Sequence, residues 1–319
     1  MTTSIVPIEN REVKSGANLF NDALVARFVK FAGVSPSSVA TYAKSLRQML
    51  KYFAANNITE PTREALVNWI EDMKTAGRAS STIQLYVTAA KIFFRWLSQE
   101  GLFANIADHL KTGVKPSHGH KKDALDAEQC RDLVANVKGD SVKNLRDKAI
   151  LTLMTTAGVR TIEVVRANVK DIRFERGKVF LYVTGKGHNE ADDKILLSKQ
   201  AHAAIRAYLK ARGKVSATDP LFASTSRRNK NARLETQTIS RLVKRNLREI
   251  GLDSPRLTAH SLRHAVATNL IFAGVELPKV QMILRHRNIS TTMIYAAAWE
   301  RYTNDGEQIL SDMIFGNVG

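Results

Sequence analysis

Residues 111–123 divide the sequence into two stretches with different hydrophobic patterns. This segment, KTGVKPSHGHKKD, mixes Gly, Pro, Ser, His and Lys, and such a composition is typical of a linker between domains. Helical patterns alone precede it, whereas helical and strand-like patterns follow it. Because 319 residues are enough for about two domains of ordinary size, we predict one folded domain on each side of this linker.

The stretch before the linker predicts an all-helical domain over residues 18–110. In its second helical pattern, Ser35 is a suitable N-cap and Pro36 suits the first helical position. Apolar residues recur there at helical spacing, and they do so again at about 19–31, from Pro61 to Gly77, and at 81–101. Residues 1–17 are polar and lack a clear period, so we interpret them as an N-terminal arm.

Residues 124–303 predict a mixed second domain. Asp126 and Gln129 have the spacing of a capping box, which begins a helix. Two strand-like runs, 178–184 and 194–197, predict an antiparallel hairpin. Helical patterns cover about 127–137, 144–157, 199–212, 235–250, 259–273, 277–285 and 290–300. The expected fold class is therefore mainly α with a small antiparallel β-sheet.

The charge balance points to a polyanionic partner. The net charge is +18 and the sequence pI is about 10.0, and the excess of Lys and Arg lies on both sides of the linker. Few soluble proteins are this basic unless they meet nucleic acid, although general solubility is the plainer explanation.

No uncharged apolar run approaches the ~18 residues of a membrane span, and no secretory leader is visible, so we expect a cytoplasmic protein. Cys130 is the single cysteine, which excludes an internal disulfide.

The second domain holds the residue types that cut a phosphodiester without a metal. Such a reaction needs a nucleophile, cations around the non-bridging oxygens and a proton donor for the leaving oxygen. These residue types occur in four segments: TAGVRTIEVVRANVKDI (156–172), TGKGHNEADDKILL (184–197), TAHSLRHAVAT (258–268) and LRHRNISTTMIY (284–295).

In this order and with these spacings, the segments resemble the motifs of the tyrosine recombinase, or phage integrase, family. The resemblance implies a two-domain DNA clamp in which residues 18–110 form a core-binding domain and residues 124–303 the catalytic domain. It implies action on double-stranded DNA with specific recombination sites, a homotetramer on two such sites, a 3′-phosphotyrosyl intermediate, and no cofactor or metal. The catalytic set carried over is Arg160, Lys186, His260, Arg263, His286 and Tyr295.

Each of these residues has a role that its chemistry suits. Tyr295 would attack phosphorus, and because its ordinary pKa is about 10, nearby cations are expected to favour the phenolate. Arg160 and Arg263 suit the non-bridging oxygens, since each guanidinium donates two parallel hydrogen bonds. Lys186 would protonate the departing 5′ oxygen, and His260 would accept or return the tyrosine proton. His286 would donate a hydrogen bond to the phosphate.

Taken singly, these residues have ordinary structural explanations. Tyr295 in its Ile-Tyr-Ala setting resembles a core tyrosine, and Tyr302 is a rival nucleophile that lacks the preceding Thr-Thr. The segments also depart from the family pattern, because Arg285 stands where glycine is usual before the second histidine, and Ala297 replaces a later histidine. Arg285 would either add a phosphate contact or shift His286.

Other features predict contacts outside the catalytic set. Arg227, Arg228, Lys230, Lys244 and Arg245 are expected to contact DNA phosphates, with solvated positive surface as the alternative. The tail 304–319 contains a short amphipathic stretch that would pack on its own domain or dock on a neighbouring protomer.

The leading hypothesis is a site-specific recombinase. The alternatives are a type IB topoisomerase-like relaxing enzyme and a non-catalytic DNA-binding protein of the same fold.

Overall fold

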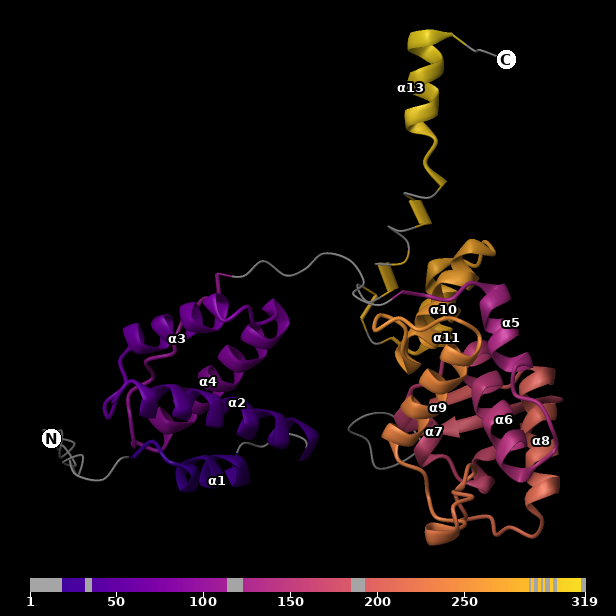
Figure 1. Ribbon diagram of the computed structural model, residues 1–319, viewed down its shortest axis with the longest axis horizontal. Coiled ribbons are helices and arrows are strands. Elements are labelled where there is room, and N and C mark those ends of the chain that lie inside the picture. Colours follow the sequence, from indigo (N-terminus) through magenta and orange to yellow (C-terminus); the bar gives the residue numbers. More distant parts are fainter. Residues whose placement is uncertain are drawn as a thin grey trace, which may run out of the picture. The chain divides into compact units, whose positions relative to one another are not determined.

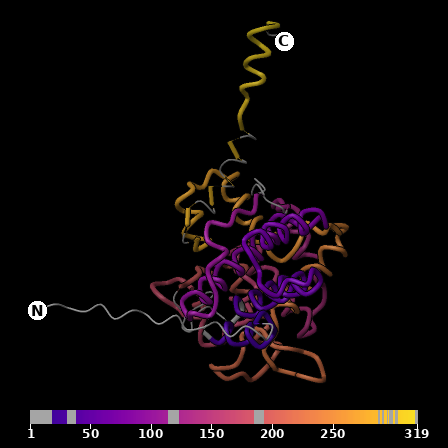
Figure 2. Tube along the Cα trace, turned by 90° about the vertical axis from the view of Figure 1, so that its left-hand side faces the viewer, coloured from indigo at the N-terminus to yellow at the C-terminus, as the bar shows by residue number. Residues whose placement is uncertain are grey.

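The computed structural model describes residues 19–31, 36–113, 123–184, 193–286, 288–289, 292–293, 295, 299–300 and 303–316. The chain divides into two compact units, residues 1–118 and 119–319, which run from indigo to purple and from magenta to yellow in Figure 1. Figure 2 follows the same Cα trace from the side. The finer domain bounds, including the arm at 1–17 and the tail at 304–319, stay predictions.

The first unit is helical, as expected. Its helices are α1 (Asp22–Phe31), α2 (Pro36–Ala55), α3 (Arg63–Thr75) and α4 (Ser80–Gln99). Aromatic side chains fill its core, in which the rings of Phe28 and Phe93 meet edge-to-face at 5.3 Å between centroids. Helix α3 begins where the Thr62 hydroxyl accepts a hydrogen bond from the Ala65 N–H at 3.2 Å.

The second unit combines helices with a small antiparallel sheet. Its helices are α5 (Ala127–Ala135), α6 (Val142–Ala157), α7 (Thr161–Arg166), α8 (Lys199–Arg212), α9 (Thr236–Glu249), α10 (Ala259–Phe272), α11 (Leu277–Leu284) and α13 (Gly306–Phe315), with 3-10 turns η1 (Val169–Asp171) and η2 (Arg227–Asn229). The strands β1 (Ile172–Glu175), β2 (Lys178–Val183) and β3 (Asp193–Leu196) pair in the order β1-β2-β3. Leu181 is paired with Ile172 on one side and Ile195 on the other, and its side chain is buried in the core.

Helix α6 organises this unit. Most of its residues are buried, and it packs against α5, α8 and α10 (Figure 1). It ends at Gly158, whose φ of 58° lies in the left-handed region that favours glycine. A Cβ atom at Gly158 would stand 2.7 Å from Cδ2 of Leu284, so the end of α6 and the end of α11 meet closely here.

The sequence predicted most of the long elements but missed several of the shortest ones. The capping box at the start of α5 is confirmed, because Asp126 and Gln129 each accept the other's backbone N–H through their side chains. Strand β1 and helix α7 were not predicted, since they have only 4 and 6 residues and too little periodicity to be recognised. The expected helix at 290–300 lies partly outside the described residues. No helix in the described part of the chain is long and apolar enough to cross a bilayer.

Candidate active site

Arg160 is placed by the turn that follows Gly158. It is the N-cap of α7, and the carboxylate of Glu163 binds it twice, accepting the Arg160 backbone N–H at 2.8 Å and its Nη1 at 2.8 Å. Glu163 is buried, whereas about a third of the Arg160 side chain remains exposed. The guanidinium is therefore held on one side and open on another, as a group that receives a ligand would be.

Arg263 bonds to the ends of two helices, at Gly158 after α6 and at Leu284 in α11. It lies on α10, is 2% exposed, and donates from Nη1 to the Gly158 carbonyl at 2.5 Å and from Nη2 to the Leu284 carbonyl. Burial first, and then the charges of Arg160 and Arg285, lower the pKa of Arg263 to about 9, which leaves it charged at neutral pH. The two predicted arginines thus share one electropositive region.

His286 lies beside these arginines. Its Nδ1 forms a hydrogen bond with the Thr292 hydroxyl at 2.8 Å, and Thr292 is fully buried. Burial, followed by the charges of Arg263 and Arg160, lowers the pKa of His286 to about 4. The imidazole is consequently neutral near pH 7 and acts as a hydrogen-bonding group without adding charge.

Tyr295 is also buried and hydrogen-bonded. Its hydroxyl pairs with Nδ1 of His264, and the ring centroids lie 5.5 Å apart. Burial raises the pKa of Tyr295 to about 12, while the positive charge of Arg263 acts in the opposite direction. The charge of Arg263 thus favours the phenolate, as expected, but in the free protein the loss of water outweighs its effect.

His264 is the residue that sequence reasoning missed. It follows His260 by four positions on α10, so the two rings lie on one helix face, with centroids 4.5 Å apart. His260 is exposed, and its charge contributes to the lowered pKa of His286. The spacing of two histidines by one helical turn was the signal available in the sequence. Among the predicted set, Lys186 lies outside the described residues, as does the rival nucleophile Tyr302.

The predicted DNA-contact residues fall into two groups. Arg227, Arg228 and Lys230 are exposed at the turn η2. Lys244 and Arg245, on α9, instead meet carboxylates, with Lys244 3.0 Å from Asp253 and Arg245 3.0 Å from Asp147.

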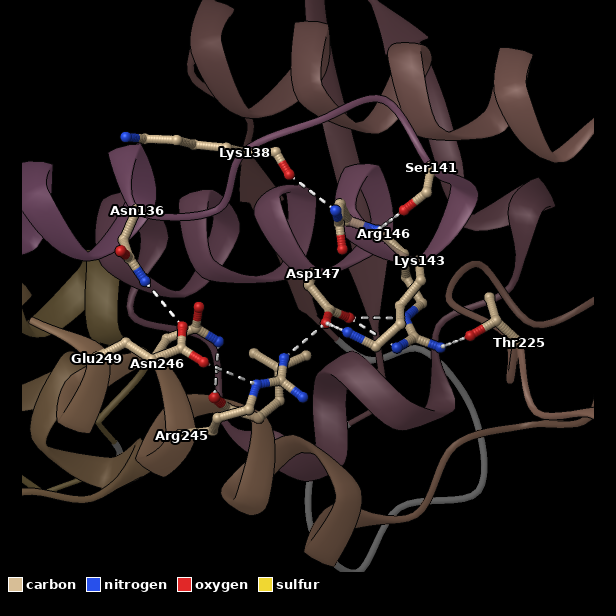
Figure 3. Close-up of polar contacts among 12 residues, drawn as sticks. Asn136, Lys138, Ser141, Lys143, Arg146, Asp147, Thr225, Arg245, Asn246 and Glu249 are labelled. Carbon is tan, nitrogen blue, oxygen red and sulfur yellow. Dashed lines mark hydrogen bonds and ion pairs between the residues drawn. The ribbon is translucent and has the colours of Figure 1, made fainter.

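Figure 3 shows Asp147 at the centre of a cationic cluster on α6 and α9. The buried carboxylate of Asp147 also binds Arg146, 2.7 Å away, and Lys143, 3.3 Å away. Arg146 in turn donates to the Ala223 carbonyl at 2.9 Å and so anchors the segment that leads to η2. The cluster therefore connects α6 both to α9 and to the segment before η2. Because Arg245 is paired with Asp147, it is less available for a DNA phosphate than the exposed residues of η2.

Two other chemistries find no support in the described residues. No group of three or more His, Cys, Asp or Glu side chains lies close enough to hold a metal ion in the described part of the chain. Burial, and then the charge of Asp126, raise the pKa of Cys130 to about 11, so this thiol stays protonated and is a poor nucleophile.

Comparison with known families matches both units. Residues 123–301 match the model of the phage integrase family, and residues 27–101 match the model of the phage integrase N-terminal SAM-like domain. The chain is 29% identical over 293 residues to the tyrosine recombinase XerA of Pyrococcus horikoshii, covering 92% of this chain and 95% of that protein. It is 30% identical over 274 residues to XerD of Halalkalibacterium halodurans, covering 82% and 87%.

Solved structures share the fold. The XerH site-specific recombinase in a post-cleavage complex with palindromic difH superposes with a TM-score of 0.71 at 19% identity, covering 96% of this chain and 91% of that one. A lambda integrase fragment bound to a core site superposes with a TM-score of 0.62 at 16% identity, covering 84% and 96%. With the family model matched from residue 123 to residue 301, the chain belongs to the phage integrase family and is a tyrosine recombinase.

Proposed function

We propose that this recombinase cuts and rejoins DNA at specific sites through Tyr295, with Arg160 and Arg263 binding the scissile phosphate. The observation that carries the proposal is the position of Arg263, which bonds to the loops on both sides of the site and interacts electrostatically with Arg160 and with Tyr295. The electrostatic coupling supports a nucleophile and two guanidinium groups acting on one phosphate, which is the arrangement a metal-free transesterification needs.

The reaction exchanges one phosphorus–oxygen bond for another. The Tyr295 oxygen forms a bond to phosphorus while the bond from phosphorus to the 5′ oxygen breaks, which leaves a 3′-phosphotyrosyl linkage and a free 5′ hydroxyl. Arg160 and Arg263 stabilise the charge that gathers on the non-bridging oxygens. Attack by a 5′ hydroxyl of another strand reverses the steps, and because the bond energy is kept in the phosphotyrosyl link, no ATP is needed.

Two proton transfers accompany this exchange, one from Tyr295 and one to the departing 5′ oxygen. Since the pKa of Tyr295 is about 12, the tyrosine loses its proton as it attacks, and His264 is in hydrogen-bonding contact to accept it. His260 lies against His264 and is placed to pass the proton on. From its position in the sequence, Lys186 supplies the proton that the 5′ oxygen gains.

His286 has one tautomer that suits the phosphate. If the Thr292 hydroxyl donates to Nδ1, the ring proton stands on Nε2 and can be donated to a non-bridging oxygen. The lowered pKa of His286 keeps the ring neutral, so it serves as a donor whose orientation is fixed by Thr292.

Charge supports a DNA partner, and the exposed helix α13 supports an assembly of protomers. A net charge of +18 favours binding to duplex DNA, and the exposed Arg227, Arg228 and Lys230 suit phosphate contacts. We further propose a homotetramer on two recombination sites, in which α13 docks on a neighbouring protomer. Its apolar residues Ile309, Leu310, Met313, Ile314 and Phe315 are 52–79% exposed in the single chain.

Covalent capture of DNA tests this function. Random-sequence duplexes are incubated with the wild-type protein, those that become covalently attached are sequenced, and the selected duplex is remade with a nick beside the cleavage site. We expect a covalent product with the wild-type protein and none with Tyr295→Phe, which keeps the ring and removes the nucleophile. Failure to attach to any duplex would favour plain DNA binding. Relaxation of supercoiled DNA without strand exchange between two duplexes would favour a topoisomerase.

A further inference from the structure

Arg285 occupies a backbone position that favours glycine. It follows α11 with φ 56° and ψ 48°, the left-handed region that L side chains adopt only at some cost. Its side chain is 7% exposed, so a charged guanidinium has also been removed from most of its water. Interactions that glycine cannot make must offset both of these costs.

Those interactions reach the turn that carries Arg160. Nη2 of Arg285 donates to Oε2 of Glu163 at 2.8 Å, and the Arg285 backbone carbonyl accepts from Nη2 of Arg160 at 3.4 Å. Nη1 donates to the Ile283 carbonyl at 2.8 Å and fixes the guanidinium to its own turn. Nε is buried without a hydrogen bond and lies 3.6 Å from a carboxylate oxygen of Asp193, the first residue of β3.

Glu163 transmits these contacts to Arg160. Its Oε2 accepts from both Arg285 and the Arg160 backbone, while its Oε1 accepts Nη1 of Arg160. Burial alone would raise the pKa of Glu163, but the charge of Arg285 and the hydrogen bonds from Arg160 outweigh it and lower this pKa. A carboxylate that is charged and bonded at each oxygen holds Nη1 of the Arg160 guanidinium in place.

We propose that Arg285 is a positioning residue, which holds the Glu163 carboxylate and, through it, the Arg160 guanidinium in place for the scissile phosphate. The proposal rests on the proposed strand-transfer function and adds a residue to it. In this proposal Arg285 acts through the Glu163 carboxylate, which accepts from its Nη2, and is assigned no contact with the phosphate. Glycine at this position would relieve the backbone and release Glu163 at the same time.

The test compares Arg285→Gly and Arg285→Lys with the wild-type protein on the nicked duplex selected above. We expect the single-turnover rate of covalent attachment to fall about tenfold in Arg285→Gly, because a displaced group near the reacting atoms loses transition-state stabilisation. DNA affinity should stay unchanged and the melting temperature should stay equal or rise. Arg285→Lys keeps the charge without the planar fork and should recover only part of the rate. Arg131→Ala, on the exposed face of α5, controls for loss of one positive charge.

A second substrate separates positioning from a general structural role. Replacing one non-bridging oxygen at the scissile phosphate by methyl removes its negative charge, so the reaction depends less on Arg160. The defect of Arg285→Gly should shrink on this methylphosphonate duplex. A rate within about twofold of wild type on the ordinary duplex, or an equal loss on both duplexes together with a lower melting temperature, would overturn the proposal. If the wild-type protein forms no covalent product, or if Tyr295→Phe still forms one, the proposed function fails instead.

Discussion

Tyr295 begins the proposed reaction as a buried phenol whose proton is difficult to remove. Burial raises its pKa to about 12, and its hydroxyl is hydrogen-bonded to Nδ1 of His264. At neutral pH almost no phenolate is present, so the proton has to move during the attack rather than before it. The neighbour that receives it therefore affects the rate directly.

His264→Phe is expected to slow covalent attachment about 100-fold or more, because the variant keeps an aromatic ring of similar volume but has no atom to accept the proton. His264→Asn, whose side-chain amide can hydrogen-bond near the position of Nδ1 but cannot take up a proton, should be similarly impaired. The measurement is single-turnover attachment to the selected nicked duplex, with DNA affinity measured in parallel. A His264→Phe rate equal to that of wild type would show that the proton leaves by another route.

The low pKa of His286 also makes stability depend on pH. This pKa is about 4 in the folded protein against an ordinary value of 6.5, so between these values the unfolded chain binds more protons. The free energy of unfolding should then rise with pH across about 4 to 6.5, and this contribution is lost as the pH falls through that window. The charged groups that act on His286 are Arg263, Arg160, Arg285 and His260. The pKa of Glu163 is lowered by folding, so Glu163 reduces the free energy of unfolding only as the pH falls below its ordinary pKa of 4.5.

Urea unfolding at a series of pH values tests this dependence. His286→Gln removes the titrating ring, so its stability should change less between pH 6.5 and pH 4.5 than that of the wild-type protein. Loss of His260 serves as the comparison, because this histidine is exposed whereas His286 is partly buried. Identical slopes in wild type and His286→Gln would mean that other groups produce the effect.

Motif spacing identified Arg160, Arg263, His286 and Tyr295, and the structure brings these residues into one region. The partners that orient them could be recognised only in part. Arg285 was visible as a departure from the pattern, but its bond to Glu163 connects positions 122 residues apart, and no local pattern records such a contact. The bond between His264 and Tyr295 likewise depends on how α10 packs.

At the scale of elements, the site depends on how the ends of α6 and α11 meet. Gly158 ends α6, and its carbonyl accepts Nη1 of Arg263. A Cβ atom added at Gly158 would stand 2.7 Å from Cδ2 of Leu284, so the Leu284 side chain would have to shift. Glycine would end α6 equally well without the close approach between Gly158 and Leu284. Gly158 therefore contributes both to the fold of the unit and to the placement of Arg263.

Gly158→Ala should lower the free energy of unfolding by about 2 to 4 kcal/mol, the sum of left-handed strain and overpacking against Leu284. Covalent attachment should slow as well, because the carbonyl that holds Arg263 is displaced. Gly251→Ala is the matched control, since its φ of 79° is also positive but nothing lies within 4 Å of the added Cβ. The control should lose only about 1 kcal/mol, the strain alone. Equal losses in the two variants would show that the contact with Leu284 does not matter.

Long elements were the easiest to predict from the sequence. Helices such as α2 and α4 carry 20 residues each and repeat their apolar positions often enough to be recognised. Strand β1 could not be found this way, because its 4 residues include the exposed Phe174 and it exists through its pairing with β2. Short elements of this kind depend on tertiary contacts more than on local pattern.

At the scale of the whole molecule, two units of different character belong to one DNA-acting chain. The family models match each unit separately, at residues 27–101 and 123–301, and the sequence had indicated this division through the composition of 111–123. The DNA target sequence was beyond its reach, since base readout depends on where side chains lie against the DNA.

Helix α13 is the element that an assembly of protomers would stabilise most clearly. It has 10 residues, which is marginal for an isolated helix in water, and none of its residues is buried in the single chain. Its apolar side chains would gain stability by burial against another protein surface.

Deleting residues 307–319 should leave covalent attachment to a single nicked duplex within about twofold of wild type, because Tyr295 and the arginines precede the deletion. Strand exchange between two separate duplexes should be lost, since the proposed contact between protomers is absent. Leu310→Asp should reproduce this loss by placing a charge on the apolar face, whereas Gln308→Ala, on a polar position of the same helix, should not. Native gel analysis of two-duplex complexes measures the assembly directly. If the truncated protein exchanges strands at the wild-type rate, α13 packs on its own subunit and the assembly is held together by other surfaces.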